Sequence, residues 1–231
     1  SLGKLNTKAN QEDFQWIKNN EKDNRVKRSF IRSLRHQLND NDVSRFLEDI
    51  IISDTSYYSI ADAIRVLSVV DSSKAKEHVT KLLNTESHND VIRKSTLSYY
   101  GQVKTMFNYN RLKELAEYGK FSWASRSTII YELSKYQKTR PKTYDHILSF
   151  FDDKDRFVRM AVIAQIGNYG NESNYGLLDE MVEKDPVLSI NSRRAKAKIQ
   201  KRKNSISKKS KTQTVEQLNK KINAIKNILL D

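Results

Sequence analysis

The stretch Asp155-Arg156-Phe157-Val158-Arg159-Met160-Ala161-Val162-Ile163-Ala164-Gln165-Ile166-Gly167 decides how the rest of the chain is interpreted. An acidic residue opens it, Arg159 follows, and the small residue Ala161 stands two positions after that arginine. Apolar residues then recur up to Gly167 with the spacing of a helix face. We therefore expect a turn followed by a short amphipathic helix.

The same pattern returns at nearly constant intervals along the chain. Aligned on Arg159, its copies start at positions 27, 59, 93, 126, 159 and 193, with gaps of 32, 34, 33, 33 and 34 residues. A basic residue fills five of these six positions, and a small residue commonly stands two positions later. A steady period of about 20–50 residues is typical of stacked structural repeats.

A second amphipathic run lies between each pair of these positions. The runs cover residues 42–52, 73–83, 110–118, 141–151 and 174–184, and residues 12–20 form a similar run at the start. Each unit is therefore predicted to be a helical hairpin that cannot bury its apolar face alone. The predicted fold class is all-α: an alpha-alpha superhelix of about six helical hairpins with a short C-terminal heptad helix.

The recurring basic residue is predicted to have a structural task. We expect it to hydrogen-bond the carbonyl end of a helix or an Asp of the neighbouring unit. Small residues at 29, 61, 95 and 161 are expected to let paired helices approach closely. Gly167, Gly170 and Gly176 are expected to serve as loop and C-cap glycines.

Composition supports helices and excludes several classes of protein. The 231 residues are 37% hydrophobic and 30% charged, with only 6 Gly and 2 Pro, which is sparse for turn-rich β or α/β folds. The absence of Cys excludes disulfides and thiolate metal sites. No apolar run approaches the roughly 20 residues of a membrane span. We expect a cytoplasmic protein without membrane contact.

The net charge of +14 is concentrated near the C-terminus. Residues 193–211 contain ten Lys or Arg and no acid, and subtracting these ten leaves +4 for the rest of the chain. This basic segment is interpreted as a solvated linker, a binding site for nucleic acid or another polyanion, or a contact with an acidic face of another domain. The candidate contact residues are Arg193, Arg194, Lys201, Arg202, Lys203, Lys208 and Lys209.

Three regions are predicted from these patterns. Residues 1–200 form the repeat domain, residues 201–213 a basic linker, and residues 214–231 an amphipathic helix. The last region carries apolar residues at the spacings 3, 4, 3 and 4 of a heptad seam, namely Val215, Leu218, Ile222, Ile225 and Leu229. Two heptads are short for an independent coiled coil, so this helix is expected to fold back or to pair with another chain.

No catalytic constellation is apparent. The four histidines, at positions 36, 78, 88 and 146, do not have a metal-ligand spacing, and no phosphate-binding loop or nucleophile motif occurs. Capping explains the carboxylates of Asp152, Asp153 and Asp155 better than acid–base catalysis does. We therefore predict no catalytic, cofactor-binding or metal-binding residue in this chain.

Four segments resemble one known family. Residues 54–63 (DTSYYSIADA) and 86–93 (ESHNDVIR) are similar to segments in the C-terminal HEAT-like domain of M1 zinc aminopeptidases. The Tyr118-Gly119 step before Arg126, and residues 152–167, resemble the units that follow in that family. The resemblance covers about residues 23–231, and generic HEAT repeats share half of it.

The resemblance implies a HEAT-like solenoid that packs on a catalytic module and limits peptide access to its chamber. The family's zinc-binding HExxH helix and its GxMEN loop are absent from these residues, so zinc is expected only in the parent catalytic domain. The partner would be that domain of the same polypeptide or another protein, with peptide substrate affected indirectly. The alternatives are a free-standing HEAT-repeat scaffold for protein–protein interaction and a nucleic-acid binder resembling helical-repeat alkylpurine DNA glycosylases.

Overall fold

The computed structural model describes residues 9–207, which are helical with short connections and contain no strand. The chain divides into two compact units, residues 1–161 and 162–231, and the division falls within helix α10. The all-α class predicted from the sequence is confirmed. Each unit is described by itself.

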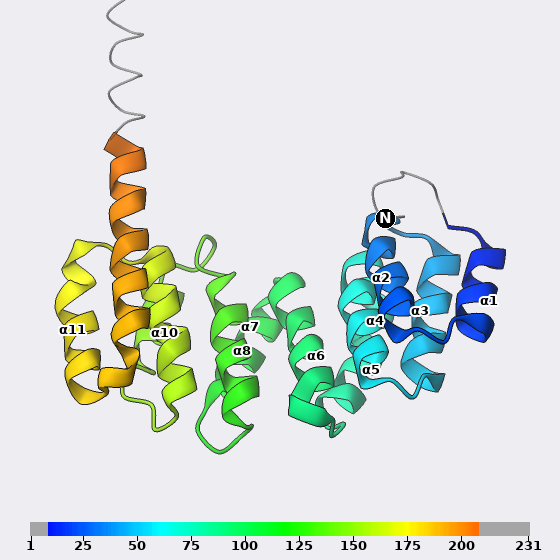
Figure 1. The fold of residues 1–231 in the computed structure, drawn as a ribbon, viewed down its shortest axis with the longest axis horizontal. Helices are drawn as coiled ribbons and strands as arrows, with labels where there is room; N and C mark the ends of the chain where they lie inside the picture. The colour runs from blue at the N-terminus through cyan, green and yellow to red at the C-terminus, as the bar shows by residue number, and fades with distance from the viewer. Residues whose placement is uncertain (1–8, 208–231) are drawn as a thin grey trace, which may run out of the picture. The chain divides into compact units, whose positions relative to one another are not determined.

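The first unit is built from consecutive helices joined by short turns (Figure 1). Asp40 caps the start of α3 by accepting from the backbone N–H groups of Asp42 and Val43, and Asp71 caps α5 in the same way. The helices are α1 (Gln11–Asn20), α2 (Asn24–Ser33), α3 (Asn41–Ser53), α4 (Tyr57–Val70), α5 (Ser72–Leu83), α6 (Val91–Gln102), α7 (Met106–Ala116), α8 (Trp123–Ser134) and α9 (Thr143–Leu148), with short 3-10 turns η2 (Leu34–His36) and η3 (His88–Asp90).

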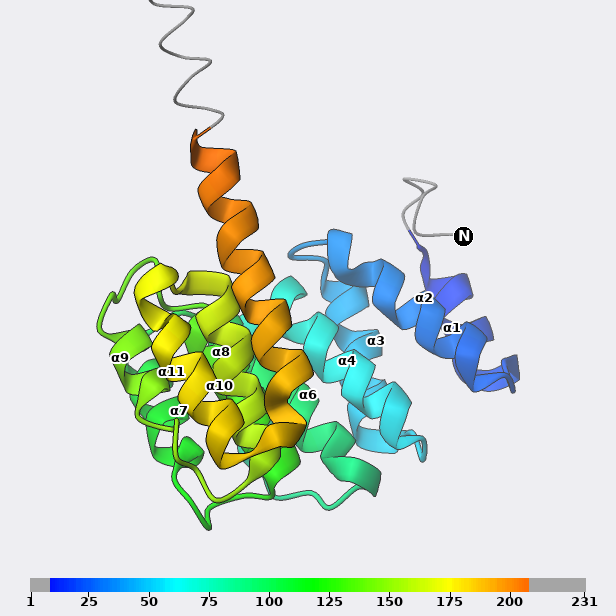
Figure 2. The same cartoon turned by 60° about the vertical axis from the view of Figure 1, so that its left-hand side comes forward.

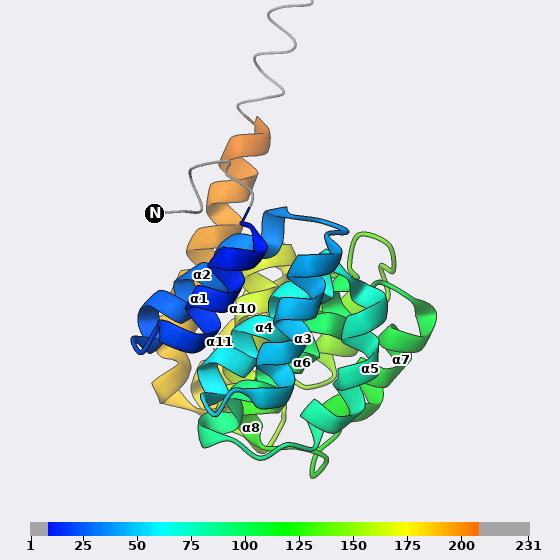
Figure 3. The same cartoon turned by 90° about the vertical axis from the view of Figure 1, so that its right-hand side faces the viewer.

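These helices form two layers. Helices α2, α4, α6 and α8 pack against one another in chain order and are called the first layer. Helices α3, α5, α7 and α9 each pack on their sequence neighbours in that layer and form the second layer. Figure 3 shows α5 and α7 on one side of this unit and α2 and α4 on the other. The predicted hairpins are therefore present, with the recurring basic residues in the first layer.

An aromatic cluster closes the N-terminal end of the first unit. The rings of Phe14 and Phe46 stack with centroids 4.9 Å apart, and Phe30 meets both edge-on at 6.0 and 5.8 Å. All three side chains are buried. Offset stacking and edge contacts between such rings add to the stabilisation from their buried area, so this cluster fixes α1 to α2 and α3.

The second unit continues from α10 (Arg156–Tyr169) through η4 (Glu172–Asn174), α11 (Tyr175–Lys184) and η5 (Pro186–Leu188) into a last helix over residues 189–207. Figure 2 shows α11 beside this last helix. A Cβ added at Gly167 would lie 3.0 Å from Ala195 Cα. Gly167 therefore lies inside α10 and allows close approach of the last helix. Gly176 lies in the first turn of α11, so the prediction of these two residues as loop or C-cap glycines is wrong.

The structure also corrects the predicted linker at residues 201–213. Residues 201–207 continue the last helix without a break. Lys and Arg are good helix formers, and a helix that packs along only one face does not need an apolar residue in every turn. The remainder of the predicted linker and the predicted heptad helix, residues 208–231, lie outside the described residues.

Candidate interaction surfaces

Two of the recurring arginines, Arg93 and Arg126, contact the ends of the preceding helices. Arg93 Nε donates to Leu83 O at 2.7 Å, and Arg126 Nε donates to Ala116 O at 2.9 Å, each across ten residues. Arg159 Nη1 donates to Asp153 O at 2.5 Å. Carbonyl groups at a helix C-terminus lack intrahelical partners and favour a cation there. The predicted structural task is confirmed for Arg93 and Arg126, whereas Arg193, at the sixth recurring position, makes no such contact among residues 9–207.

Arg126 also binds two carboxylates from the next repeat. Its Nη1 donates to Asp153 Oδ1 at 3.0 Å and to Asp155 Oδ2 at 2.8 Å, and its Nη2 pairs with the other oxygen of Asp153. Only 1% of the Arg126 side chain and 6% of the Asp153 side chain are exposed. Tyr118 covers the guanidinium at 5.3 Å from its ring centroid. Asp153 thus forms a buried ion pair with Arg126, and Asp155, whose side chain is 33% exposed, forms a second pair at its edge.

The candidate basic residues differ in their surroundings. Arg202 donates to the carbonyl oxygens of Gly167 and Gly170 at the end of α10, and Lys203 pairs with Glu172 at 2.7 Å. The exposed side chains of Arg193, Arg194 and Lys201 have no hydrogen bond or ion pair with any other residue in 9–207. Lys208 and Lys209 lie outside the described residues. Two of the seven candidates therefore have structural partners, and three present free cations.

Sequence reasoning missed a group of charged residues between α2 and α4, here called the arginine cluster: Arg28, Arg32, Asp62 and Arg65. Asp62 Oδ2 accepts from Arg28 Nε at 2.8 Å and lies 3.9 Å from Arg32 Nη1, and Asp62 Oδ1 lies 3.5 Å from Arg65 Nη1. Arg28 and Asp62 are 34 residues apart, one repeat. Two features of the sequence could have predicted this cluster. Arg28 and Asp62 are separated by one repeat, and α2 contains no Asp or Glu that could pair with its own arginines.

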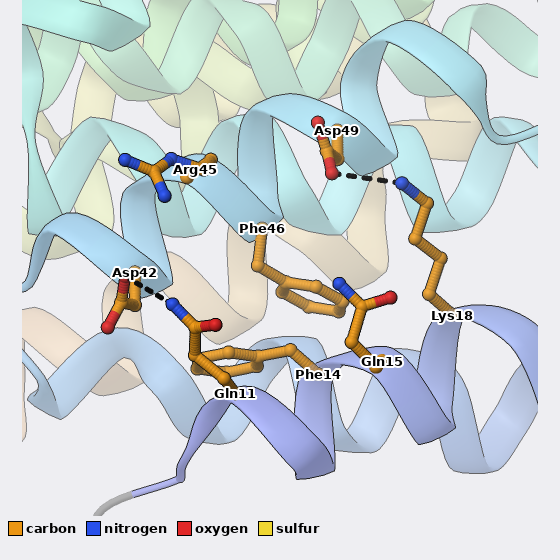
Figure 4. A pocket seen from close by; sticks show the side chains of 8 residues that line it. All are labelled: Gln11, Phe14, Gln15, Lys18, Asp42, Arg45, Phe46 and Asp49. Atoms are coloured by element: carbon orange, nitrogen blue, oxygen red, sulfur yellow. Dashed lines mark hydrogen bonds and ion pairs between the residues drawn. The ribbon is translucent and has the colours of Figure 1, made fainter.

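Two hollows in the first unit are packing seams. Figure 4 shows the smaller, of about 100 Å³, between α1 and α3. The stacked rings of Phe14 and Phe46 lie along it. Two contacts bridge its ends, Gln11 Nε2 to Asp42 Oδ1 at 3.0 Å and Lys18 Nζ to Asp49 Oδ2 at 2.9 Å. The larger, of about 390 Å³, lies beside α5, α6 and α7 and is lined in part by Tyr99, Tyr100 and Phe107.

Within residues 9–207, no group of three or more acidic or histidine side chains is arranged to hold a metal ion. Burial lowers the pKa of His146, whose ring meets Phe150 edge-on with centroids 5.3 Å apart. His78 contacts Glu48 at 3.4 Å across neighbouring helices. His78 is thus paired with a carboxylate, and the Nε2 atom of His146 is buried without a hydrogen-bond partner among the described residues.

Comparison with known proteins adds no assignment: no protein-family model matches the sequence, and no curated protein gives a significant match. Over the described residues, none of the helices combines the length and apolar character that crossing a membrane requires.

Proposed function

We propose that this chain is the non-catalytic C-terminal helical-repeat domain of a zinc aminopeptidase, which packs on the catalytic module and shapes peptide access. The observation that carries the proposal is the similarity of residues 54–63 and 86–93 to segments of that family's C-terminal domain. Zinc then belongs to the catalytic module, and the setting is cytoplasmic.

The positions of these segments in the fold support the proposal. Asp54 ends α3 and pairs with Lys27 of the same hairpin at 3.1 Å, and Asp62, later in the first segment, accepts from Arg28 one repeat earlier at 2.8 Å. In the second segment, Asp90 accepts from Arg93 at 2.5 Å and from Ser125 at 3.0 Å on α8. Both segments maintain stacking between hairpins, the requirement for a domain that acts by presenting a shaped surface.

The proposal is tested first on the purified chain. We expect no stoichiometric zinc by elemental analysis and no hydrolysis of aminoacyl amides. The coding sequence upstream of Ser1 should encode an HExxH module. Co-expressing that module with and without residues 1–231 should change cleavage of long peptides more than cleavage of a small aminoacyl amide. Turnover by the pure chain, or unchanged long-peptide cleavage, would contradict the proposal.

The second candidate is a free-standing scaffold that binds another protein, and the arginine cluster favours it. If no peptidase module is encoded upstream, this candidate replaces the first. Nucleic-acid binding ranks below both. It predicts that affinity for a short oligonucleotide falls steeply as salt rises, since phosphate contacts release counterions.

A further inference from the structure

The first layer has an unusual balance of charge. Its two acidic side chains, Asp62 and Glu132, are each only 3% exposed. Its eight basic residues are Arg25, Lys27, Arg28, Arg32, Arg65, Arg93, Lys94 and Arg126. The charge that solvent or a partner meets on these four helices is therefore positive, although the chain outside residues 193–211 has a net charge of only +4.

The arginine cluster presents two guanidinium groups at this surface that can bind further anionic groups. One nearly buried carboxylate, Asp62, faces three arginines, which leaves two positive charges in excess. Arg32 and Arg65 expose 51% of their side chains, and their closest Asp62 contacts are as long as 3.9 and 3.5 Å. Each guanidinium has five N–H donors, so both retain donors that point away from Asp62.

Neighbouring groups fix the orientation of these arginines. Arg65 Nη2 donates to Ser95 Oγ on α6 at 2.7 Å, and Arg28 lies over the ring of Tyr58 at 4.8 Å. Ser95 is fully buried, so it is a rigid anchor. Guanidinium groups held in place in this way lose little freedom when they bind a second carboxylate in the planar, paired geometry that Arg favours.

The surroundings fit a polypeptide better than a nucleic acid. Arg28, a member of the cluster, covers one face of Tyr58 and so removes that face from stacking. Base stacking needs an open aromatic face. Val69, one turn after Arg65 on α4, is 47% exposed and offers an apolar contact. Charge combined with apolar contact is typical of a protein interface.

We propose that the arginine cluster is a docking site for an acidic segment of a partner protein. The carboxylates of neighbouring Asp or Glu side chains bind Arg32 and Arg65, while Asp62 and Ser95 hold these arginines in position. This inference goes beyond the proposed function and stands without it, because it concerns the chemistry of the surface and not the identity of the module that carries the acidic segment.

The test uses the full chain and a fluorescein-labelled 12-residue peptide in which Glu alternates with Ala and Leu, with both ends blocked. Fluorescence anisotropy at about 50 mM salt, where screening is weak, should show saturable binding. The double variant Arg32→Gln/Arg65→Gln should weaken this binding at least tenfold. Raising the salt should weaken it further, and a peptide with Lys in place of Glu should not bind.

A control variant distinguishes binding at the arginine cluster from a general effect of the protein's positive charge. Arg45→Gln/Lys81→Gln removes two exposed cations from the second layer, and we expect it to change peptide affinity less than twofold. Thermal unfolding of each variant shows whether it is folded. Equal weakening by both double variants, or no binding of the acidic peptide, would overturn the proposal. A 12-nucleotide single strand that binds more tightly than the peptide through the same two arginines would also overturn it, in favour of nucleic acid.

Discussion

Arg126 joins three consecutive parts of the stack through one side chain. It donates to the end of α7 at Ala116 O and to the carboxylates of Asp153 and Asp155, which precede α10. The group is buried, so its hydrogen bonds compensate for the cost of removing charge from water. Removing the cation alone leaves carboxylates without a counter-ion.

We expect Arg126→Met to lower the free energy of unfolding by about 3–5 kcal/mol, the range for breaking a buried ion pair by deleting one partner. Urea denaturation followed by circular dichroism measures this change. Arg111→Met is the control, because the pair of Arg111 with Glu114 is 38% and 50% exposed, and solvent screening leaves such exposed pairs with little effect on stability. Similar losses in the two variants would show that Arg126 has no special role.

The carboxyl group of Glu132 makes the stability of the protein depend on pH. Burial raises the pKa of its carboxyl group, against the lowering effect of Lys135 at 2.6 Å. The folded protein therefore binds this proton more tightly than the unfolded chain. This contribution to stability is fully present below the unfolded-state pKa and is lost as the pH rises through the folded-state pKa.

We expect Glu132→Gln to gain stability relative to the unmodified protein as the pH rises from the unfolded-state pKa of a glutamate to the raised folded-state pKa, by about 1.4 kcal/mol per pH unit within that interval. Urea denaturation across this range measures it. Glu114→Gln is an opposite control: a hydrogen bond from Arg111 lowers the pKa of Glu114, so that variant should lose relative stability as the pH rises. A constant Glu132→Gln difference would refute the argument.

At the scale of elements, the junction of α10 with the helix over residues 189–207 combines close packing with a cap. Gly167 brings the backbones together at Ala195, and Arg202 binds the carbonyl oxygens of Gly167 and Gly170. Those carbonyls lie at the C-terminal end of α10, where a cation is favourable. Arg202 thus performs for α10 what Arg126 performs for α7.

We expect Arg202→Gln to destabilise the second unit by about 1.5–3 kcal/mol, the range for hydrogen bonds that involve a charged group. Lys201→Gln is the adjacent control, and since Lys201 is exposed its change should stay within about 0.5 kcal/mol. Amide hydrogen exchange at the end of α10 reports the effect locally. If the amides at the end of α10 exchanged equally slowly in both variants, Arg202 would not be the residue that caps α10.

At the scale of the whole molecule, the helical hairpins were predictable because the same sequence pattern returns every 32–34 residues. Regular apolar spacing located the hairpins, and the return of a basic residue at the position of Arg126 in most repeats indicated a stacking contact. The helix across residues 201–207 was not predictable, because a run of Lys, Arg and Ser has the composition of a linker and only the contacts of Arg202 reveal the difference. The arginine cluster was not predicted, because it forms only when particular faces of α2 and α4 meet, and that pairing is set by tertiary packing.

The net charge of +14 gives a last prediction for the entire chain. Like charges destabilise a compact state, and salt screens them, with a Debye length of about 30 Å at 0.01 M and about 8 Å at 0.15 M. Buried pairs such as Arg126 with Asp153 are screened much less. We therefore expect the free energy of unfolding to rise when NaCl increases from about 0.01 to 0.15 M.

The matched variant is Arg193→Gln/Arg194→Gln/Lys201→Gln, which removes three exposed cations that have no partner among residues 9–207. Its net charge falls from +14 to +11, so its stability should rise less with salt than that of the unmodified chain. Urea denaturation at three salt concentrations measures both proteins. A decrease in the stability of the unmodified chain with added salt would contradict this prediction. Attraction within its exposed ion pairs would then outweigh repulsion between like charges. The cations of the first layer and of residues 193–201 would in that case already be neutralised by neighbouring acids.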